Sequence, residues 1–128
     1  MIGLYIIEDT QGIDSSIRVD CDIPLLIQDK HVNSDGSISY PEPECPVSSS
    51  MWVPEGYGSV NLVNGVAFPY VRIPQEQCRL RLINGASARR YSLDLPFANQ
   101  CQIIAKDSAY VSHPKNLPKP FSIKSQFL

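Results

Sequence analysis

Strand-sized segments, in which apolar residues either alternate with polar ones or follow each other without interruption, divide this chain. Residues 23–27 are almost wholly apolar, which predicts a strand buried on both faces. Residues 79–82 read Arg-Leu-Arg-Leu, so the arginines should lie on one face of a strand and the leucines on the other. Residues 91–95 alternate again, with Tyr91 and the two leucines pointing inward. The same reasoning predicts further strands over residues 3–8, 37–40, 101–105 and 121–128.

Turn residues separate these segments. Asn64-Gly65 lies between the β-prone residues 60–63 and 66–73, and this dipeptide is the strongest short hairpin signal because a type I′ turn needs two residues with positive φ. Asn33-Ser-Asp-Gly36 predicts a second turn. About eight short strands without a convincing amphipathic helix predict an all-β sandwich or barrel. Connecting segments are expected at residues 13–22, which are polar, and at residues 41–54, a long loop with four prolines.

Composition and charge narrow the classes of function. The 128 residues suit a single domain, and 43% hydrophobic with 19% charged residues argue for a globular protein. The net charge of −2 provides no positive field for nucleic acid or an anionic membrane, and Arg89-Arg90 is interpreted as solvated surface charge. No apolar run approaches the ~20 residues that span a bilayer. Residues 1–8 lack the pattern of a secretory signal, and the compartment stays open.

The four cysteines are Cys21, Cys45, Cys78 and Cys101. They are widely spaced and include no Cys-x-x-Cys pair, so a zinc or thioredoxin-like site is not indicated. Four cysteines allow three disulfide pairings, and the sequence does not choose among them. Buried free thiols are the simpler alternative.

Several segments follow one another in an order that is itself informative. They are Asp22–Asp29 with Asp35-Gly36, Trp52–Glu55, Leu62–Gly65 with Phe68–Tyr70, Arg79–Asn84 with Ser87 and Arg89–Leu95, and Gln102–Asp107. In this order they resemble the middle cupredoxin-like domain of multicopper oxidases of the laccase, bilirubin-oxidase and spore-coat laccase type, and the resemblance extends over most of residues 3–128. The chain departs from that family at one turn, where Asp107-Ser108-Ala109 replaces a frequent Asp-Gly-Gly.

The resemblance implies a cupredoxin-like Greek-key β-sandwich or barrel that is incomplete. Residues 1–9 would be a remnant of the last strand of a preceding cupredoxin domain and residues 10–22 a linker. Residues 23–128 would be the middle domain without its closing strands. Strand edges without partners favour aggregation, so we expect the isolated chain to be poorly soluble or to self-associate through them.

Copper chemistry needs more ligands than this chain has. The family couples one-electron oxidation of organic substrates to reduction of dioxygen to water, using a blue copper centre and a cluster of three coppers. A blue copper site takes two imidazoles and a thiolate at one metal, with a weak axial ligand. Only His31, in a turn-like region, and His113, in a loop, are present, and surface positions explain both. The resemblance implies a middle domain without copper, so we expect no catalytic, cofactor-binding or metal-ligating residue here.

Neighbouring carboxylates raise two further candidates. Asp29 stands two positions before His31 and suggests an oriented imidazole, but no nucleophile accompanies the pair. Asp20 and Asp22 share one face of an extended segment, which a solvated linker explains.

The residues before the predicted hairpin raise two more. Gly56-Tyr57-Gly58 lacks both the helix and the Lys-Ser/Thr pair of a phosphate-binding loop. Trp52 and Tyr57 are candidates for lining a substrate cleft, because long loops on β-scaffolds often do so. The simpler interpretation is that both anchor the loop onto the barrel.

Taken together, the residues and the resemblance predict a copper-free structural domain of a laccase-like multicopper oxidase that is inactive alone. It would hold two flanking copper-binding cupredoxin domains, its expected partners, so that electrons can cross between their sites. Copper would then be the cofactor of the full-length parent only. The alternative is a free-standing, non-catalytic cupredoxin-like binding or structural module; a small mononuclear copper protein is disfavoured by the ligand count.

Overall fold

The computed structural model describes residues 3–7, 19–40, 56–107 and 109–123. The chain forms two compact units, one comprising Met1–Arg89 with Ser125–Leu128 and the other Arg90–Lys124. The expected loop over residues 41–54 lies outside the described residues. Residues 3–7 are not a strand and their side chains are exposed, so the strand predicted there is wrong for these five positions. A strand needs a hydrogen-bonded neighbour, and no strand in the described part of the chain pairs with this segment.

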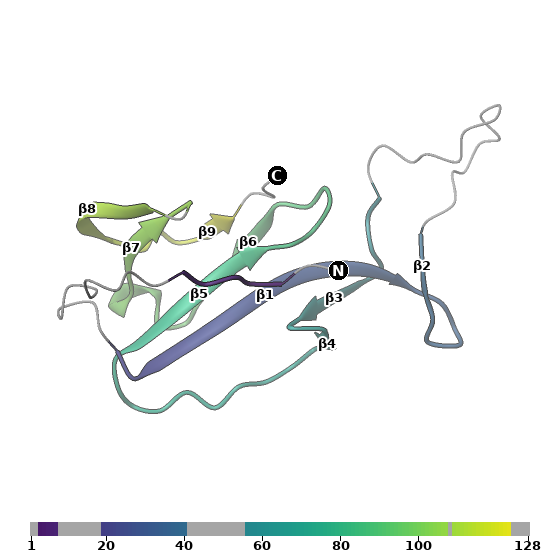
Figure 1. The fold of residues 1–128 in the computed structure, drawn as a ribbon, viewed down its shortest axis with the longest axis horizontal. Coiled ribbons are helices and arrows are strands. Elements are labelled where there is room, and N and C mark those ends of the chain that lie inside the picture. The colour runs from purple at the N-terminus through teal and green to yellow at the C-terminus, as the bar shows by residue number, and fades with distance from the viewer. Residues whose placement is uncertain (1–2, 8–18, 41–55, 108, 124–128) are drawn as a thin grey trace. The chain divides into compact units, whose positions relative to one another are not determined.

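The first unit is organised around β1 (Cys21–Val32), which contacts strands on both of its edges (Figure 1). It pairs in antiparallel fashion with β2 (Ile38–Ser39) and with β3 (Val60–Val63), and β3 continues to β4 (Val66–Ala67). On the edge opposite β3, β1 pairs in parallel with β5 (Cys78–Asn84), from Cys21↔Cys78 to Ile27↔Asn84, and β2 lies farther along this same edge. A parallel neighbour needs a crossover connection, and the chain between β1 and β5, which includes β2, β3 and β4, supplies it.

Alternation along β1 and β5 sets their two faces. Ile23, Leu25 and Ile27 share a face with their register partners on β5, which include Leu80 and Leu82. Ile27 is buried, whereas Ile23, Leu25, Leu80 and Leu82 are half-buried. The strand predicted over residues 23–27 is confirmed, but it is longer and is not buried on both faces. The opposite face includes Asp22 and Pro24, which are exposed.

The Asn64-Gly65 hairpin is confirmed, with φ of 51° at Asn64 and 81° at Gly65. Asn64 also continues the pairing of β3 beyond the end of that strand. Its backbone N–H donates to the Leu26 carbonyl at 2.9 Å, and its side-chain oxygen accepts from the Leu26 N–H at 2.9 Å. Its side-chain nitrogen donates to the Pro24 carbonyl at 2.9 Å. One asparagine therefore satisfies three backbone groups of β1 that lie beyond the last residue of β3.

Pro24 is compatible with a strand that has neighbours on both edges. Pro24 and Leu26 are two positions apart, so their backbone groups point to the same edge of β1. At that edge the N–H and the carbonyl of Leu26 bind Asn64. The N–H that proline lacks would therefore point toward the hairpin edge and not toward β5, so the parallel ladder loses no bond.

The other predicted turn and the second hairpin strand are also present, with one difference in length. Asn33–Gly36 connects β1 to β2, and Gly36 has a φ of +84°. The strand expected over residues 66–73 ends at Ala67, because Phe68 takes a positive φ of 49° and Pro69 follows. Positive φ is uncommon for a bulky residue and interrupts the extended conformation.

A disulfide joins Cys21 to Cys78 at the first register pair of β1 and β5, with Cα atoms 4.6 Å apart. The two residues are 57 positions apart in sequence, and closing a loop of that size contributes about 4 kcal/mol on a chain-entropy model. Free thiols are therefore wrong for this pair. Cys101 is a free, half-buried thiol, and Cys45 lies outside the described residues.

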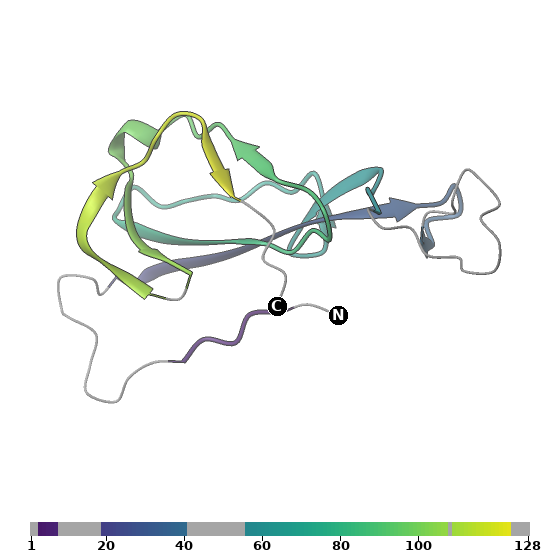
Figure 2. The same ribbon diagram turned by 90° about the horizontal axis from the view of Figure 1, so that it is seen from above.

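The second unit contains two pairs of antiparallel strands (Figure 2). β6 (Tyr91–Leu93) pairs with β9 (Phe121–Ile123), and β7 (Gln102–Lys106) pairs with β8 (Ala109–Asn116). Tyr91, Leu93 and Leu95 are half-buried while Ser92 and Asp94 are exposed, so the predicted alternation is confirmed. A short 3-10 helix, η2 (Ala98–Gln100), precedes β7 and buries Ala98.

β8 was not predicted, because seven of its eight residues are exposed and it therefore lacks the apolar alternation of a half-buried strand. It contains His113, so the expectation of a loop at that histidine is wrong. His31 likewise lies in β1, opposite Ser39 of β2, and not in a turn. The all-β class is confirmed, and the arrangement is consistent with a cupredoxin-like fold. Within the ranges given above, no helix has the length and hydropathy needed to cross a membrane.

The bonds of Asn64 can be separated from its backbone conformation by two substitutions. Asn64→Gly keeps positive φ accessible but removes the side-chain bonds to Leu26 and Pro24, and should lower the free energy of unfolding by about 1–2 kcal/mol. Asn64→Ala should cost about 1 kcal/mol more, because alanine disfavours the left-handed region. Urea unfolding followed by circular dichroism measures both, with exposed Asn99→Ala as the control. If Asn64→Gly matches that control, the side chain does not support β1.

Candidate functional site

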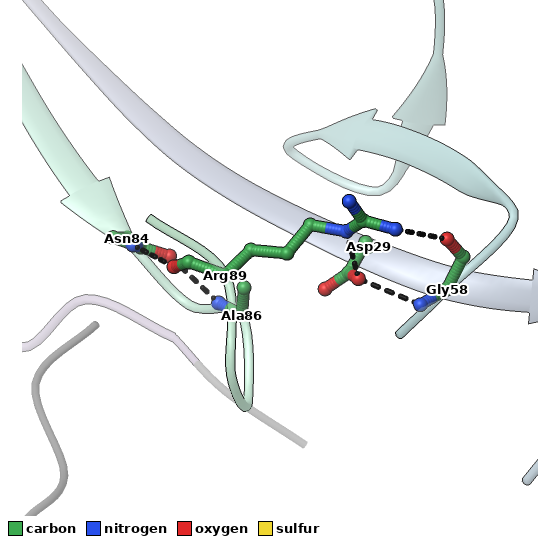
Figure 3. A network of polar contacts seen from close by, with 5 residues as sticks. All are labelled: Asp29, Gly58, Asn84, Ala86 and Arg89. Atoms are coloured by element: carbon green, nitrogen blue, oxygen red, sulfur yellow. Dashed lines mark hydrogen bonds and ion pairs between the residues drawn. The ribbon is translucent and has the colours of Figure 1, made fainter. Parts of the chain in front are cut away.

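Among the described residues of the first unit, Asp29, on β1, is the buried residue with a charged side chain. The residue is 8% exposed overall and its side chain 2%. One oxygen, Oδ2, accepts a bond from the Arg89 Nε–H at 2.7 Å and another from the Gly58 backbone N–H at 2.7 Å (Figure 3). A buried charge needs both a counter-charge and hydrogen bonds, and Asp29 has both.

Arg89 binds two partners with its guanidinium. Besides the carboxylate, it donates from Nη2 to the Gly58 carbonyl at 2.9 Å, so Gly58 is held through both of its backbone groups. The guanidinium also lies over the Tyr57 ring, 5.0 Å from the ring centre, within the range of a cation–π contact. These contacts join β1, the segment before β3 and the segment after β5.

Gly58 is in this position because the backbone of β1 leaves no room for a side chain. A Cβ at Gly58 would lie 2.6 Å from the Asp29 carbonyl carbon and would also meet the Lys30 backbone. The close approach allows the Gly58 N–H to reach the carboxylate. Glycine is the only residue that fits such a contact without a shift of β1.

The backbone before Arg89 is also fixed. Asn84, the last residue of β5, donates from its side-chain nitrogen to the Arg89 carbonyl at 2.7 Å, and its side-chain oxygen accepts from the Ala86 N–H at 3.0 Å. Ala86 is 7% exposed. Figure 3 shows this turn on one side of the arginine and Gly58 on the other. We call Asp29, Tyr57, Gly58, Asn84 and Arg89 the clasp.

The geometry of the clasp indicates a structural role. Its carboxylate oxygen Oδ2 binds Arg89 and Gly58, so the partners that Asp29 has in the structure differ from the His31 that the sequence suggested. Arg89 is half-buried and ion-paired, so it is not the solvated surface charge expected from Arg89-Arg90. Tyr57 packs against the arginine, which supports its anchoring role over a place in a cleft. Trp52 lies outside the described residues.

A second charged cluster lies on the face of the sheet that carries Asp22. Arg81 donates to both oxygens of Asp22, at 2.8 and 2.7 Å, and Arg79 donates to Oδ2 at 3.3 Å. The hydrogen bond from Arg81 is the largest effect on the pKa of Asp22 and lowers it below its usual value. Burial, the next largest effect, raises this pKa, and the positive charges of Arg81 and Arg79 lower it further. Asp22 is therefore an ion-paired strand residue, and the expectation of a solvated linker at this position is wrong.

The side chains that can bind metal gather elsewhere. Cys21, Glu76 and Cys78 have ligand atoms within 4.8 Å of one another. Among the described residues, they form the one cluster of three histidine, cysteine or acidic side chains close enough to share a metal ion. It contains no histidine, and its two sulfurs are joined in the disulfide. It therefore does not fit the two imidazoles and one thiolate of a blue copper centre. His31 lies in the first unit and His113 in the second.

Sequence reasoning missed the clasp because its partners are 60 positions apart in sequence. One signal was present: Asp29 interrupts the apolar pattern on the same face as Ile27, where a charge requires a partner. Nothing in the sequence identified Arg89 as that partner.

No family model matches the chain. Among curated proteins it is 39% identical over 100 residues to a laccase of Bacillus subtilis and 39% identical over 99 residues to a laccase of Haloferax volcanii. Each match covers 74% of this chain, but 20% and 15% of the two laccases. The chain is also 34% identical over 128 residues to the cell division protein FtsP of Salmonella typhimurium, covering 97% of this chain and 24% of that protein. It thus spans at most about a quarter of the length of these relatives.

The clasp can be tested by removing its cation. Arg89→Ala leaves the carboxylate of Asp29 enclosed without a counter-charge, and should lower the free energy of unfolding by about 2 kcal/mol. Arg89→Lys should recover less than half of that, because an ammonium cannot reproduce the planar fork that reaches both Asp29 and Gly58. The exposed neighbour provides the control, Arg90→Ala, which should stay within about 0.5 kcal/mol of the parent. Equal destabilisation by Arg89→Ala and Arg90→Ala in urea unfolding would exclude a structural role for the ion pair.

The Asp22 cluster predicts a small dependence of stability on pH. Because the folded-state pKa of Asp22 is lowered, its ionised form stabilises the fold above the ordinary pKa of about 4, and this contribution disappears as pH falls through the lowered value. At pH 7, Asp22→Asn should cost at most about 1 kcal/mol, since the pair is partly exposed. The difference in free energy of unfolding between Asp22→Asn and the parent should disappear in strong acid and decrease in high salt. Urea midpoints across pH measure it, with exposed Asp94→Asn as control; a difference that persists in strong acid contradicts the assignment.

Proposed function

The chain is a cupredoxin-like domain of the multicopper-oxidase type, and we propose that it serves as a copper-free, structural middle domain of a larger laccase-like protein. In this proposal the parent oxidises phenolic or related organic substrates one electron at a time and reduces dioxygen to water. The domain itself holds two flanking copper-binding cupredoxin domains in place. It has no catalytic, cofactor-binding or metal-ligating residue for that reaction.

The single observation that carries the proposal is the weak burial of the sheet in the first unit. Among the described residues, the buried apolar side chains are Ile27, Ala86 and Ala98, and only the first of these lies in a strand. A chain of this length would ordinarily bury roughly two-thirds of its unfolded surface around a larger core. A sheet with so little cover is expected when other parts of a protein pack against it.

Exposed apolar side chains support the same interpretation. Tyr5 and Ile7 are 89% and 83% exposed, and Phe68 and Tyr70 are 86% and 89% exposed. Large apolar groups gathered on short segments mark surfaces that another structure covers. In the proposal the flanking domains cover them; in the isolated chain they favour self-association.

The ligand inventory supports a domain without copper. The chain has two histidines, whereas a blue copper centre and a three-copper cluster together need many more imidazoles. The group formed by Cys21, Glu76 and Cys78 includes neither of them. The redox chemistry would therefore take place in neighbouring domains, and this chain would set the distance between their sites.

A second candidate parent is favoured by the extent of the matches. The cell division proteins named FtsP match 97–100% of this chain, whereas the two laccases match 74%. A cell-division protein built on the same scaffold is therefore an alternative parent, and a free-standing binding or structural module is a third. Sequencing the DNA that flanks the coding region separates them. A reading frame that encodes His-x-His upstream and His-Cys-His downstream supports the oxidase, and flanking sequence without these motifs contradicts it.

Copper loading tests the absence of a redox site in this chain. The purified 128-residue chain, incubated with Cu²⁺ and desalted, should retain no stoichiometric copper and should not oxidise a phenolic dye. His31→Ala and His113→Ala should leave the trace of bound copper unchanged, because neither histidine is a ligand. Copper retained at one ion per chain and lost in either variant would contradict the proposal.

A further inference from the structure

The group formed by Cys21, Glu76 and Cys78 has an arrangement that its disulfide alone does not require. The parallel register of β1 and β5 places the two cysteines directly opposite each other, with Cα atoms 4.6 Å apart. Glu76 lies in a bend two positions before Cys78 and brings a carboxylate oxygen within 4.8 Å of both sulfurs. Both cysteines are half-buried and Glu76 is exposed, so solvent and small reagents can reach the group.

We propose that, when the disulfide is reduced, Cys21, Cys78 and Glu76 bind a Zn²⁺ ion. Two thiolates and one carboxylate are ligands that this ion accepts in tetrahedral sites, with water in the fourth position. The carboxylate disfavours Cu⁺, which prefers sulfur ligands alone, and the two thiolates disfavour Mg²⁺ and Ca²⁺, which prefer oxygen. The site is independent of the proposed role within an oxidase.

Formation of the site requires a reductant, and a phosphine supplies the electrons. The phosphine breaks the S–S bond and is oxidised to its oxide, taking the oxygen atom from water. The two protons of that water pass to the two sulfurs. Zn²⁺ then replaces these protons, because the thiolate and not the thiol is the ligand, so binding releases two protons to solvent.

Strand pairing positions the backbone of the two cysteines independently of the bond between their sulfurs. Their separation is fixed by the hydrogen-bonded pairing of β1 with β5 over seven register pairs, and only the first pair carries the sulfurs. Asp22 and Arg79, the next register pair, bind each other on the opposite face of the sheet. Their charges therefore offset each other beside the site, and Asp22 does not compete with Glu76 for the metal.

The experiment uses the 128-residue chain carrying Cys45→Ser and Cys101→Ser, so that Cys21 and Cys78 are the remaining thiols. The chain is reduced with a phosphine under anaerobic conditions, desalted and titrated with Zn²⁺ by equilibrium dialysis. A pH indicator records the proton release. The reduced chain should bind about one Zn²⁺ and release about two protons per metal. The oxidised chain should bind none.

Matched variants identify the ligands. Cys21→Ser should abolish binding, and Glu76→Gln should weaken it by about tenfold or more, in line with the effect of altering groups around protein-bound metals. Asp22→Asn changes the charge by the same amount next to Cys21 but on the opposite face, and should leave the affinity within about twofold of the parent.

Three outcomes overturn the proposal: no Zn²⁺ on the reduced chain, equal binding by the oxidised chain, or equal affinity in Glu76→Gln and the parent. Circular dichroism of each variant reports whether it is folded. If Cys21→Ser unfolds, the comparison of reduced with oxidised chain and of Glu76→Gln with Asp22→Asn still decides the question.

Discussion

The parallel pairing of β1 with β5 is the constraint on which the first unit depends. It aligns residues 57 positions apart, and the hydrogen-bonded register from Cys21↔Cys78 to Ile27↔Asn84 determines which side chains of the two strands lie next to each other. On one face it creates the disulfide and a row of aliphatic side chains; on the other it places Arg79 and Arg81 beside Asp22. It also positions the end of β5 so that the turn after Asn84 can carry Arg89 back to Asp29.

The clasp fixes a part of the first unit that strand pairing does not reach. Hydrogen bonds between strands align β1 with β5 and with β3, but they do not hold the residues that lead into β3. Asp29 does this by accepting from Gly58 and Arg89 with the same oxygen, while Arg89 returns a bond to the Gly58 carbonyl. A single enclosed carboxylate thus holds the segment that leads into β3 together with the segment that follows β5. Asp29 stabilises the fold only as long as both Arg89 and Gly58 bind it, because a buried charge without partners destabilises the folded state.

Local patterns were sufficient for much of the fold and insufficient for the clusters. The Asn64-Gly65 hairpin, the alternation at Tyr91 and the arginine–leucine alternation in β5 each depend on residues a few positions apart, so the sequence predicts them directly. β8 lacks a buried face that a sequence pattern could reveal. Residues 3–7 have the side chains of a strand, but none of the described strands pairs with them. The clasp, the Asp22 cluster and the disulfide each depend on the β1–β5 register, which no local pattern contains.

Pro24 has a consequence for how copies of this chain can meet. Between Cys21 and Leu25, the side of β1 that faces away from β5 has no neighbouring strand in the described part of the chain. A strand from another molecule could pair with an open edge of this kind. Pro24, in the middle of the edge, has no N–H to donate, and its carbonyl already accepts a hydrogen bond from Asn64, so an added strand would find no backbone partner there. Pro24 thus disfavours the pairing of β1 with a strand of another molecule. Another open edge of the same sheet lies at the short strand β4, beside exposed Phe68 and Tyr70, and it has no proline within the strand.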